Sequence, residues 1–451
     1  MDPKKNSVND LTKGPVARQI LLFALPFLGS SLIQQLYNTV DLIFVGNVLG
    51  TEASAAVGAG SLLITCLLGF FTGISVGVGV VAAKAFGGGD RRALRDIVHT
   101  AAGISVLGSL LLIAVGVAFA PAFLRWLNTP EDILPLAVVY MRIYFAGLFS
   151  IVTYNVSSGI LRALGNSRDP MRYQLIGGIT NVVCDALFLI ALKQGVAGAA
   201  MATFFSQGVS ALLTARKLCR LDDGYRLRLR QIRIDRKWCA RILAVGIPSA
   251  VQAMVITLSN LIVQSRINSL GITSIAAFTA YYKVENFIYL PIMAIGQANA
   301  AFAGQNYGAG REDRVRGGVK TSLLVGIPAA LAISALLIGG SNVFFGFFSK
   351  DPDVIRLGGK LAATAFPLYF LYVIMEVLSG TIRGSGRALP PMVITLANMC
   401  GVRLIALGLL MRRYGSAEGV ARVYPITWIT SVVCLLGYLG VRRLRAKKLS
   451  R

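Results

Sequence analysis

The chain has 451 residues, of which 55% are hydrophobic and only 14% are charged. Its mean hydropathy of +0.67 excludes an ordinary soluble domain and indicates a protein that lies in lipid. The formal net charge of +25 would favour nucleic acid binding in a soluble protein, but in a membrane protein the positions of the basic residues decide its meaning. We expect no nucleic acid partner.

Long apolar runs separated by polar residues predict twelve transmembrane helices. Runs such as 101–120 and 323–338 reach or approach the roughly 20 residues that span a bilayer core as a helix, and the alternating pattern of a membrane barrel is absent. We therefore expect an all-α integral membrane protein with six helices in each half. The expected helices are residues 17–47, 53–83, 97–121, 132–158, 169–192, 196–218, 239–269, 274–303, 318–342, 354–380, 388–412 and 417–441.

Basic residues gather in alternate loops and at both termini. These segments hold most of the 45 Lys and Arg residues, so under the positive-inside rule they are cytoplasmic. An even number of helices follows independently, since both termini lie on one side. The opposite loops are short and nearly free of basic residues, although Arg412 and Arg413 run against this trend.

The longest polar interval, LDDGYRLRLRQIRIDRK at 221–237, divides the two halves. Its alternating arginines could rest on anionic lipid headgroups, or could form a positive-inside loop without a ligand. We expect the single histidine, His99, at the surface rather than in a binding site. The expected organisation is a cytoplasmic segment at 1–16, an N-lobe at 17–218, a basic cytoplasmic linker at 219–238, a C-lobe at 239–441 and a basic cytoplasmic tail at 442–451.

One constant offset relates two segments of the first half to two of the second. Gly87 and Gly89 recur as Gly308 and Gly310 (308 − 87 = 221). Twice 221 is 442, nearly the whole chain, so the duplicated unit is half the protein, and such halves usually meet around a central site in membrane proteins. The same offset maps Gly159, Arg162, Gly165, Pro170 and Met171 onto Gly380, Arg383, Gly386, Pro391 and Met392.

The repeated glycines do not form a nucleotide-binding loop. Neither 87–89 nor 308–310 lies in the pattern GxxxxGK[ST]. Glycines directly after a membrane helix are better explained as C-caps in the left-handed conformation. The segments containing Gly165 and Gly386 are expected to be structural elbows.

Four carboxylates lie deep in apolar segments, at Asp41, Asp185, Glu285 and Glu376. A charge at mid-membrane costs about 2.5 to 3.5 kcal/mol on insertion scales, so each is a functional candidate. At the offset of 221 none of them matches another acid. The two halves therefore share a scaffold and differ in chemistry.

The first half presents a candidate cation site. Tyr37 and Asp41 are i,i+4 neighbours. Asn181 and Asp185 have the same spacing, so each helix carries a polar pair on one face, and Thr203 is a third source of oxygen. These oxygens suit a small cation such as Na⁺, whereas two acids in one dry pocket could instead carry a proton. A structural role as acceptors of interhelical hydrogen bonds is the alternative.

In the second half, Glu285 predicts a substrate cavity. An acid among aromatic and thioether side chains suits a lipophilic cation, although packing alone would also produce such neighbours. Glu376 is a further cavity candidate that could instead pair with Arg383. The neighbours expected to line the cavity with Glu285 are Phe278, Tyr281, Tyr282, Tyr289 and Met293.

Pro26 interrupts the helix that carries Asp41, about four turns away along it. Proline removes a backbone hydrogen bond and permits a kink. Bending at Pro26 could therefore be coupled to the charge state of Asp41.

At these residues the chain resembles the multidrug and toxic compound extrusion (MATE) family, in its prokaryotic type. The resemblance covers essentially the whole chain and rests on ALPFLGSSLIQQLYNTVDLIFVGNVLG at 24–50, GILRALGNSRDPM at 159–171, NVVCDALF at 181–188 and GQNYGAG at 304–310. It implies two six-helix bundles related by pseudo-two-fold symmetry around a cavity that opens alternately to the two sides of the membrane.

The same resemblance implies a function: a secondary active antiporter that exports amphipathic, often cationic, compounds in exchange for H⁺ or Na⁺. Such a transporter is not an enzyme, needs no cofactor and works in the plasma (inner) membrane of a prokaryote, and because one chain contains both halves of the cavity, a monomer suffices. We expect ion coupling in the N-lobe, since second-lobe acids of the family are only partly mirrored here. The family's N-lobe cation site falls on Asp41, Asn181, Asp185 and Thr203, with Tyr37 adjacent.

Two other functions compete with this one. A lipid-linked oligosaccharide flippase of the same superfamily would need an arginine-rich cavity for a pyrophosphate, and although the deep charges are mainly acids, Arg266 and Arg403 keep it open. An intramembrane enzyme would need a nucleophile with a base or a metal motif. The chain has no HExxH pattern and a single histidine, which leaves little for such chemistry.

Overall fold

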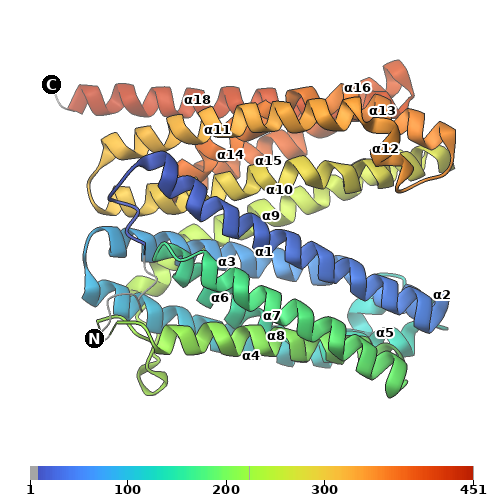
Figure 1. Ribbon diagram of the computed structural model, residues 1–451, viewed down its shortest axis with the longest axis horizontal. Helices are drawn as coiled ribbons and strands as arrows, with labels where there is room; N and C mark the ends of the chain where they lie inside the picture. Colours follow the sequence, from blue (N-terminus) through green and yellow to red (C-terminus); the bar gives the residue numbers. More distant parts are fainter. Residues whose placement is uncertain (1–8, 223, 450–451) are drawn as a thin grey trace. The chain divides into compact units, whose positions relative to one another are not determined.

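Figure 1 shows the protein as a computed structural model, which describes residues 9–222 and 224–449. Throughout this part the chain is helical and contains no strand. Eleven of the described helices are long and apolar enough to cross a membrane, or twelve when the bent pair α5 (Leu134–Ala146) and α6 (Leu148–Ala163) counts as one span. The expected all-α membrane fold is confirmed.

The chain forms two compact units. The first holds 25–250 with two short pieces at 9–13 and 308–310, and the second holds the rest. Three helices contribute to both: α1 (Val16–Phe44), α9 (Arg236–Asn268) and α10 (Ile272–Gly308). The other elements of the first unit are η2 (Val45–Leu49), α2 (Gly50–Ala59), α3 (Ser61–Gly87), α4 (Arg91–Trp126), α5, α6, α7 (Arg168–Asp185), η3 (Ala186–Ala191), α8 (Gly195–Cys219) and η4 (Leu229–Gln231).

The second unit is built from helices of the second half. The lobe boundaries expected from the sequence stay predictions, since the division between units falls within α9, after Ala250. The remaining elements are α11 (Glu312–Gly339), α12 (Ser341–Gly346), α13 (Pro352–Ala365), η5 (Phe366–Leu368), α14 (Tyr369–Gly384), α15 (Leu389–Leu396), η6 (Ala397–Val402), α16 (Arg403–Tyr414), α17 (Ala417–Ala421) and α18 (Val423–Leu449).

Two expected helices are broken at glycines. The helix expected at 53–83 is instead α2 and α3, which meet at Gly60, where a Cβ atom would lie 2.4 Å from the Cε atom of Met141. The helix expected at 132–158 bends by 40° between α5 and α6, on either side of Gly147. Apolar content shows that a segment crosses the membrane, but it does not show where close packing interrupts the helix.

The glycines that recur in the two halves have the same backbone conformation. Gly89 has φ +71° and Gly310 has φ +70°, each just after a helix. Gly165 and Gly386 have φ +77° and +85°. Only glycine adopts this region without strain from a side chain, so the expected left-handed C-caps and elbows are confirmed at these four positions.

One close helix contact also occurs twice. A Cβ atom at Gly159 would lie 2.9 Å from the carbonyl oxygen of Ser75, and one at Gly380 would lie 2.9 Å from that of Gly296. The separation is the same in both halves (159 − 75 = 84; 380 − 296 = 84). The duplication therefore extends from the sequence to the way α6 crosses α3 and α14 crosses α10.

The linker is packed onto the first unit. Leu221, Tyr225 and Leu227 belong to the hydrophobic core that α3, α4 and α6 also form. The guanidinium of Arg233 donates to the Asp96 carboxylate on α4 at 2.9 Å. Burial raises the pKa of the Tyr225 hydroxyl above its ordinary value. The segment is thus a folded part of the unit and not a free tether.

The linker also covers the single histidine. His99 is only 3% exposed, so the expectation of a surface position is wrong. Its Nδ1 atom lies 2.8 Å from the Arg95 carbonyl oxygen, and its Nε2 atom lies 3.2 Å from the Arg228 backbone nitrogen, which donates to it. The sequence around His99 is polar and could not reveal that a segment about 130 residues later would fold over it.

Candidate functional site

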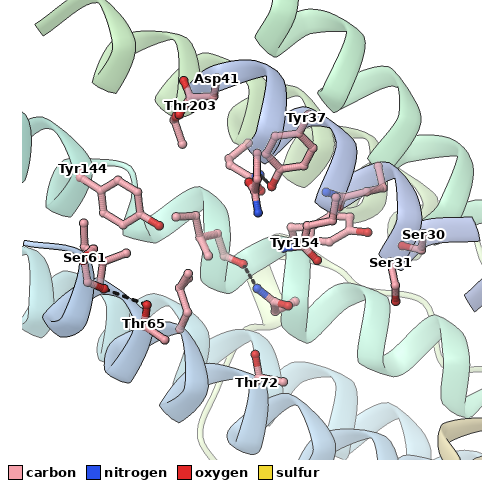
Figure 2. Close-up of a pocket in the computed structure, with 18 of the residues that line it drawn as sticks. Ser30, Ser31, Tyr37, Asp41, Ser61, Thr65, Thr72, Tyr144, Tyr154 and Thr203 are labelled. Atoms are coloured by element: carbon pink, nitrogen blue, oxygen red, sulfur yellow. Dashed lines mark hydrogen bonds between the residues drawn. The ribbon is translucent and has the colours of Figure 1, made fainter. Parts of the chain in front are cut away.

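A polar cavity of about 520 Å³ lies within the first unit (Figure 2). Helix α1 contributes one continuous face to it. Steps of three and four residues place side chains on one side of a helix, and this face is polar where a membrane helix is ordinarily apolar. The lining residues of α1 are Phe27, Ser30, Ser31, Gln34, Tyr37, Asn38 and Asp41.

The other walls come from six helices and are also rich in hydroxyls and amides. Tyr37 points into the cavity, and its hydroxyl accepts a hydrogen bond of 3.1 Å from the Gln207 amide. The remaining lining residues are Val57 of α2; Ser61, Ile64, Thr65, Leu68 and Thr72 of α3; Tyr140 and Tyr144 of α5; Ile151, Tyr154, Asn155 and Arg162 of α6; Gln174 of α7; and Thr203 with Gln207 of α8.

Asp41 and Thr203 lie together at one end of the cavity, as Figure 2 shows. Asn181 and Asp185 of α7 are 1% and 0% exposed. Of the residues expected to form the cation site, Tyr37, Asp41 and Thr203 therefore line the cavity, while Asn181 and Asp185 are buried and do not line it.

The approach of α1 to α7 explains this grouping. At Gly178 a Cβ atom would lie 3.5 Å from the Tyr37 ring, and α1 and α7 run in the same direction (Figure 1). One turn further along each helix come Asp41 and Asn181, so the contact at Gly178 sets their separation.

Five buried atoms at this end have no hydrogen-bond partner among the described residues. They are one carboxylate oxygen of Asp41, both amide atoms of Asn181 and both carboxylate oxygens of Asp185. An unsatisfied buried polar group costs about 1 to 3 kcal/mol, and more when it is charged, so such groups are rare in folded proteins. A small cation or a proton would satisfy these oxygens.

The candidate site contains few acidic side chains. Across the part of the chain that the structure describes, no three His, Cys, Asp and Glu side chains are grouped so that they could hold a metal ion. The site offers two carboxylates and neutral oxygens. Such oxygen ligands are the kind that hard cations prefer.

A π-helical segment follows each of the two aspartates. The segment η2 begins at Val45, four residues after Asp41, and η3 begins at Ala186, directly after Asp185. A π-turn closes i→i+5 hydrogen bonds in place of the i→i+4 bonds of an α-helix, and such turns are frequent at functional sites. The two acids therefore stand where their helices depart from regular geometry.

The chain was compared with models of known protein families. The MatE family model matches residues 26–187 and 248–407, more than two thirds of the chain. The chain belongs to the MatE family. It is a membrane transporter that crosses the membrane many times.

Relatives of this MatE chain match along almost its whole length. The probable multidrug resistance protein YpnP of Bacillus subtilis (strain 168) is 28% identical over 98% of each chain. The FAD transporter of Shewanella oneidensis is 25% identical over 92% of this chain and 93% of its own.

Solved structures confirm the MatE fold. A crystal structure of MATE in complex with MaD3S has a TM-score of 0.90 at 23% identity and covers 99% of this chain and 100% of its own. The outward-facing conformation of a multidrug resistance MATE family transporter has a TM-score of 0.89 at 23% identity, covering 99% of each chain.

The second unit of the MatE chain places the expected substrate residues in a packed aromatic cluster. The Tyr369 hydroxyl donates to the Glu285 carboxylate. Phe278 and Tyr281 are fully buried, and the rings of Tyr281 and Tyr282 meet edge to face with centroids 5.7 Å apart. Their role as drug contacts stays a prediction.

The other expected residues of this region also have partners. The ring of Tyr289 packs on that of Tyr372 at 5.7 Å, and the Tyr372 hydroxyl lies 3.8 Å from the Met293 sulfur. Glu376 forms a buried ion pair of 2.7 Å with Arg383, the pairing that the sequence left open. None of these side chains lines the cavity of the first unit.

Sequence reasoning missed several polar residues of the MatE cavity, among them Gln34, Asn38, Asn155 and Arg162. A signal was present for those of α1, because the polar positions between 27 and 41 recur with a helical period. Arg162 gave no such signal. It was expected at a structural elbow, and only the packing of α6 shows that its side chain lines the cavity.

Proposed function

We propose that this MatE transporter is a secondary active antiporter that exports amphipathic, mainly cationic, organic compounds in exchange for H⁺ or Na⁺ by alternating access. The observation that carries the proposal is the group of unsatisfied buried atoms on Asp41, Asn181 and Asp185 beside an open polar cavity. The names of relatives such as the probable multidrug resistance protein YpnP support the direction and the breadth of transport.

Asp41 is placed to interact with both the coupling ion and the exported compound. One of its oxygens is buried without a partner, while its side chain lines the cavity. A cation or proton at Asp41 and Asp185 would favour one conformation, and an exported compound would favour the other. Antiport requires only that the two ligands bind the two states with different affinities.

Aromatic side chains near Asp41 suit a lipophilic cation. Tyr37, Tyr140 and Tyr144 line the same cavity, and a carboxylate with aromatic faces attracts organic cations by charge and by cation–π contact. The cluster around Glu285 in the second unit would provide a further contact surface. Pro26 lies inside α1, one residue before the cavity-lining Phe27. Bending of α1 at Pro26 would be coupled to the charge state of Asp41, and unchanged transport in Pro26→Ala would refute that coupling.

We place the protein as a monomer in the plasma membrane of a prokaryote, with both termini in the cytoplasm and no cofactor. Bacterial relatives and the presence of both units in one chain support this placement. An enzyme is not supported: residues 73–77 (GISVG) match the GxSxG pattern, but Ser75 lies inside α3 and donates to the Asn155 carbonyl oxygen, whereas a nucleophile of that kind needs a strand-to-helix turn.

The flippase alternative receives little support from the arginines that kept it open. Arg266 is exposed near the end of α9. Arg403 is buried, donates to the Asn260 amide oxygen at 2.9 Å and lies over the Tyr424 ring. Neither lines the cavity of the first unit.

The decisive test is efflux of a fluorescent lipophilic cation from proteoliposomes, with a pH gradient and a Na⁺ gradient imposed separately. We expect one gradient to drive flux in the wild type and Asp41→Asn to abolish it. Glu131→Gln is the matched control, because it removes a carboxylate that is 77% exposed. Equal flux in Asp41→Asn and wild type would refute coupling at this site, and no gradient-driven flux of any cation would favour the flippase.

A further inference from the structure

Arg162 lies at the end of the cavity opposite Asp41. Its guanidinium carbon is 4.7 Å from the centroid of the Phe27 ring, and both residues line the cavity. Phe27 and Asp41 are 14 residues apart on α1 (41 − 27 = 14), which is about 21 Å along a helix. The cavity therefore has a cationic end and an anionic end.

No carboxylate of the described residues pairs with Arg162. The nearest acid in sequence, Asp169, is 3.0 Å from the Lys217 ammonium and 3.8 Å from the Arg172 guanidinium. A position in the last turn of α6 suits a basic residue, because the helix dipole is negative there. That partial charge does not replace a carboxylate for a half-buried guanidinium.

The repeat-related arginine is neutralised. Arg383 occupies the position of Arg162 in the second half (383 − 162 = 221), and it forms a buried ion pair with Glu376 at 2.7 Å. The residue that corresponds to Glu376 is Asn155 (376 − 155 = 221). The Asn155 side chain donates to the Ile151 carbonyl oxygen at 2.9 Å, so the first unit has the arginine without its partner.

The first unit also lacks the space for such a partner. In the second unit a Cβ atom at Gly296 would lie 2.4 Å from the Cγ atom of Glu376, so glycine makes room for the acid. The corresponding residue of the first unit is Ser75 (296 − 75 = 221), whose hydroxyl donates to the Asn155 carbonyl oxygen at 2.6 Å. Both changes keep the countercharge away from Arg162.

We propose that Arg162 binds an oxyanion, a carboxylate or a phosphate, of the transported compound. A guanidinium stacked on a ring keeps its N–H edges free for two parallel hydrogen bonds to such a group. The remainder of the compound extends along the α1 face toward Asp41. The cavity is therefore a site for zwitterions and organic anions as well as for cations, and this selectivity rests on the proposed export function.

The test compares ligands that differ in one charged group. Rhodamine B carries a free carboxylate and its ethyl ester does not; flavin mononucleotide carries a phosphate and riboflavin does not. Binding of each to the purified full chain is measured by fluorescence anisotropy. We expect the anionic member of one pair or both to bind about tenfold more tightly, as a charge-assisted hydrogen bond implies, and the pair that shows it identifies the oxyanion.

Two variants remove this preference by different routes. Arg162→Gln removes the guanidinium. Ser75→Gly with Asn155→Glu keeps Arg162 and its contact with Phe27, but supplies the carboxylate found in the second unit. Each should reduce the preference, measured as the ratio of the two affinities within a pair, to about twofold or less. Arg168→Gln, which removes an exposed arginine six residues away, should leave the preference unchanged.

An unchanged preference in both variants, or no preference in the wild type for either pair, would overturn the proposal. Because the measurement is binding at equilibrium without a gradient, it is independent of ion coupling. Failure of gradient-driven efflux with an intact Arg162-dependent preference would refute the export function and leave the oxyanion site standing.

Discussion

The two units differ in the partners of several buried or half-buried charged side chains. In the first, Asp41 and Asp185 have unsatisfied oxygens and Arg162 has no ion pair among the described residues. In the second, Glu376 and Arg383 neutralise each other, and Glu285 accepts from a tyrosine. The close helix crossings at glycine are the same in both. The two units therefore share the contacts that hold the helices together and differ in the partners of these buried polar side chains.

The largest effect is expected from a substitution of Asp185, which tests whether the unpaired acid of the first unit serves transport or stability. In Asp185→Asn we expect gradient-driven flux to fall by about 5- to 150-fold, the range of typical coupling free energies, without a loss of thermal stability, because a buried charge without a partner is removed. Flux in proteoliposomes and the melting temperature of the purified protein measure the two effects. Asp132→Asn, at an exposed acid, is the control, and a fall in melting temperature would show that Asp185 is structural.

The paired acid of the second unit should behave in the reverse manner. Glu376→Gln leaves Arg383 buried without a counter-ion, so we expect a loss of about 3 to 5 kcal/mol of unfolding free energy. The double variant with Arg383→Gln should recover part of it. Denaturant titration of the four proteins gives the coupling energy, and additive losses would contradict the ion pair.

The shared scaffold predicts equal effects at repeated glycines. Gly159→Ala and Gly380→Ala each place a methyl group against a carbonyl oxygen, so each should lose about 1 to 3 kcal/mol of stability. Gly437→Ala is the matched control, since nothing lies within 4 Å of its added Cβ atom. A lower melting temperature in only one of the two variants would show that the helix crossings have diverged.

The smallest effects are expected at the left-handed glycines. Gly89→Ala and Gly310→Ala should each cost about 1 kcal/mol, because an L-residue is strained at their φ values. Neither has a neighbour within 4 Å of an added Cβ atom, so backbone strain alone is measured. Gly108→Ala, inside α4 with open space around it, should be neutral or stabilising in the same melts.

The sequence predicted the features that are visible as an internal repeat or as a helical period. The offset of 221 marked Gly89 and Gly310, and the structure gives them φ values one degree apart. The i,i+4 spacing of Asn181 and Asp185 predicted one polar face, and the structure buries both on it. These features are local, so they can be seen in the sequence without knowledge of neighbouring helices.

The sequence could not predict which side chains face a cavity and which face a neighbour. The sequence did not show that Phe278 and Tyr281 are fully buried among packed rings. Arg162 and Arg383 are equivalent in sequence but differ in their partners. In each case the answer depends on residues of another helix, and the packing of those helices is a property of the folded chain.

The packed linker has a practical consequence for engineering. A segment between two halves of a transporter invites insertion of a reporter protein or an epitope, since polar connections usually tolerate insertions. Here the backbone amides of Arg228 and Asp235 donate to His99 and Thr100 of α4. An insertion between them would have to break these bonds and expose His99, so a fusion at this place would perturb the folding of the first unit instead of reporting on it passively.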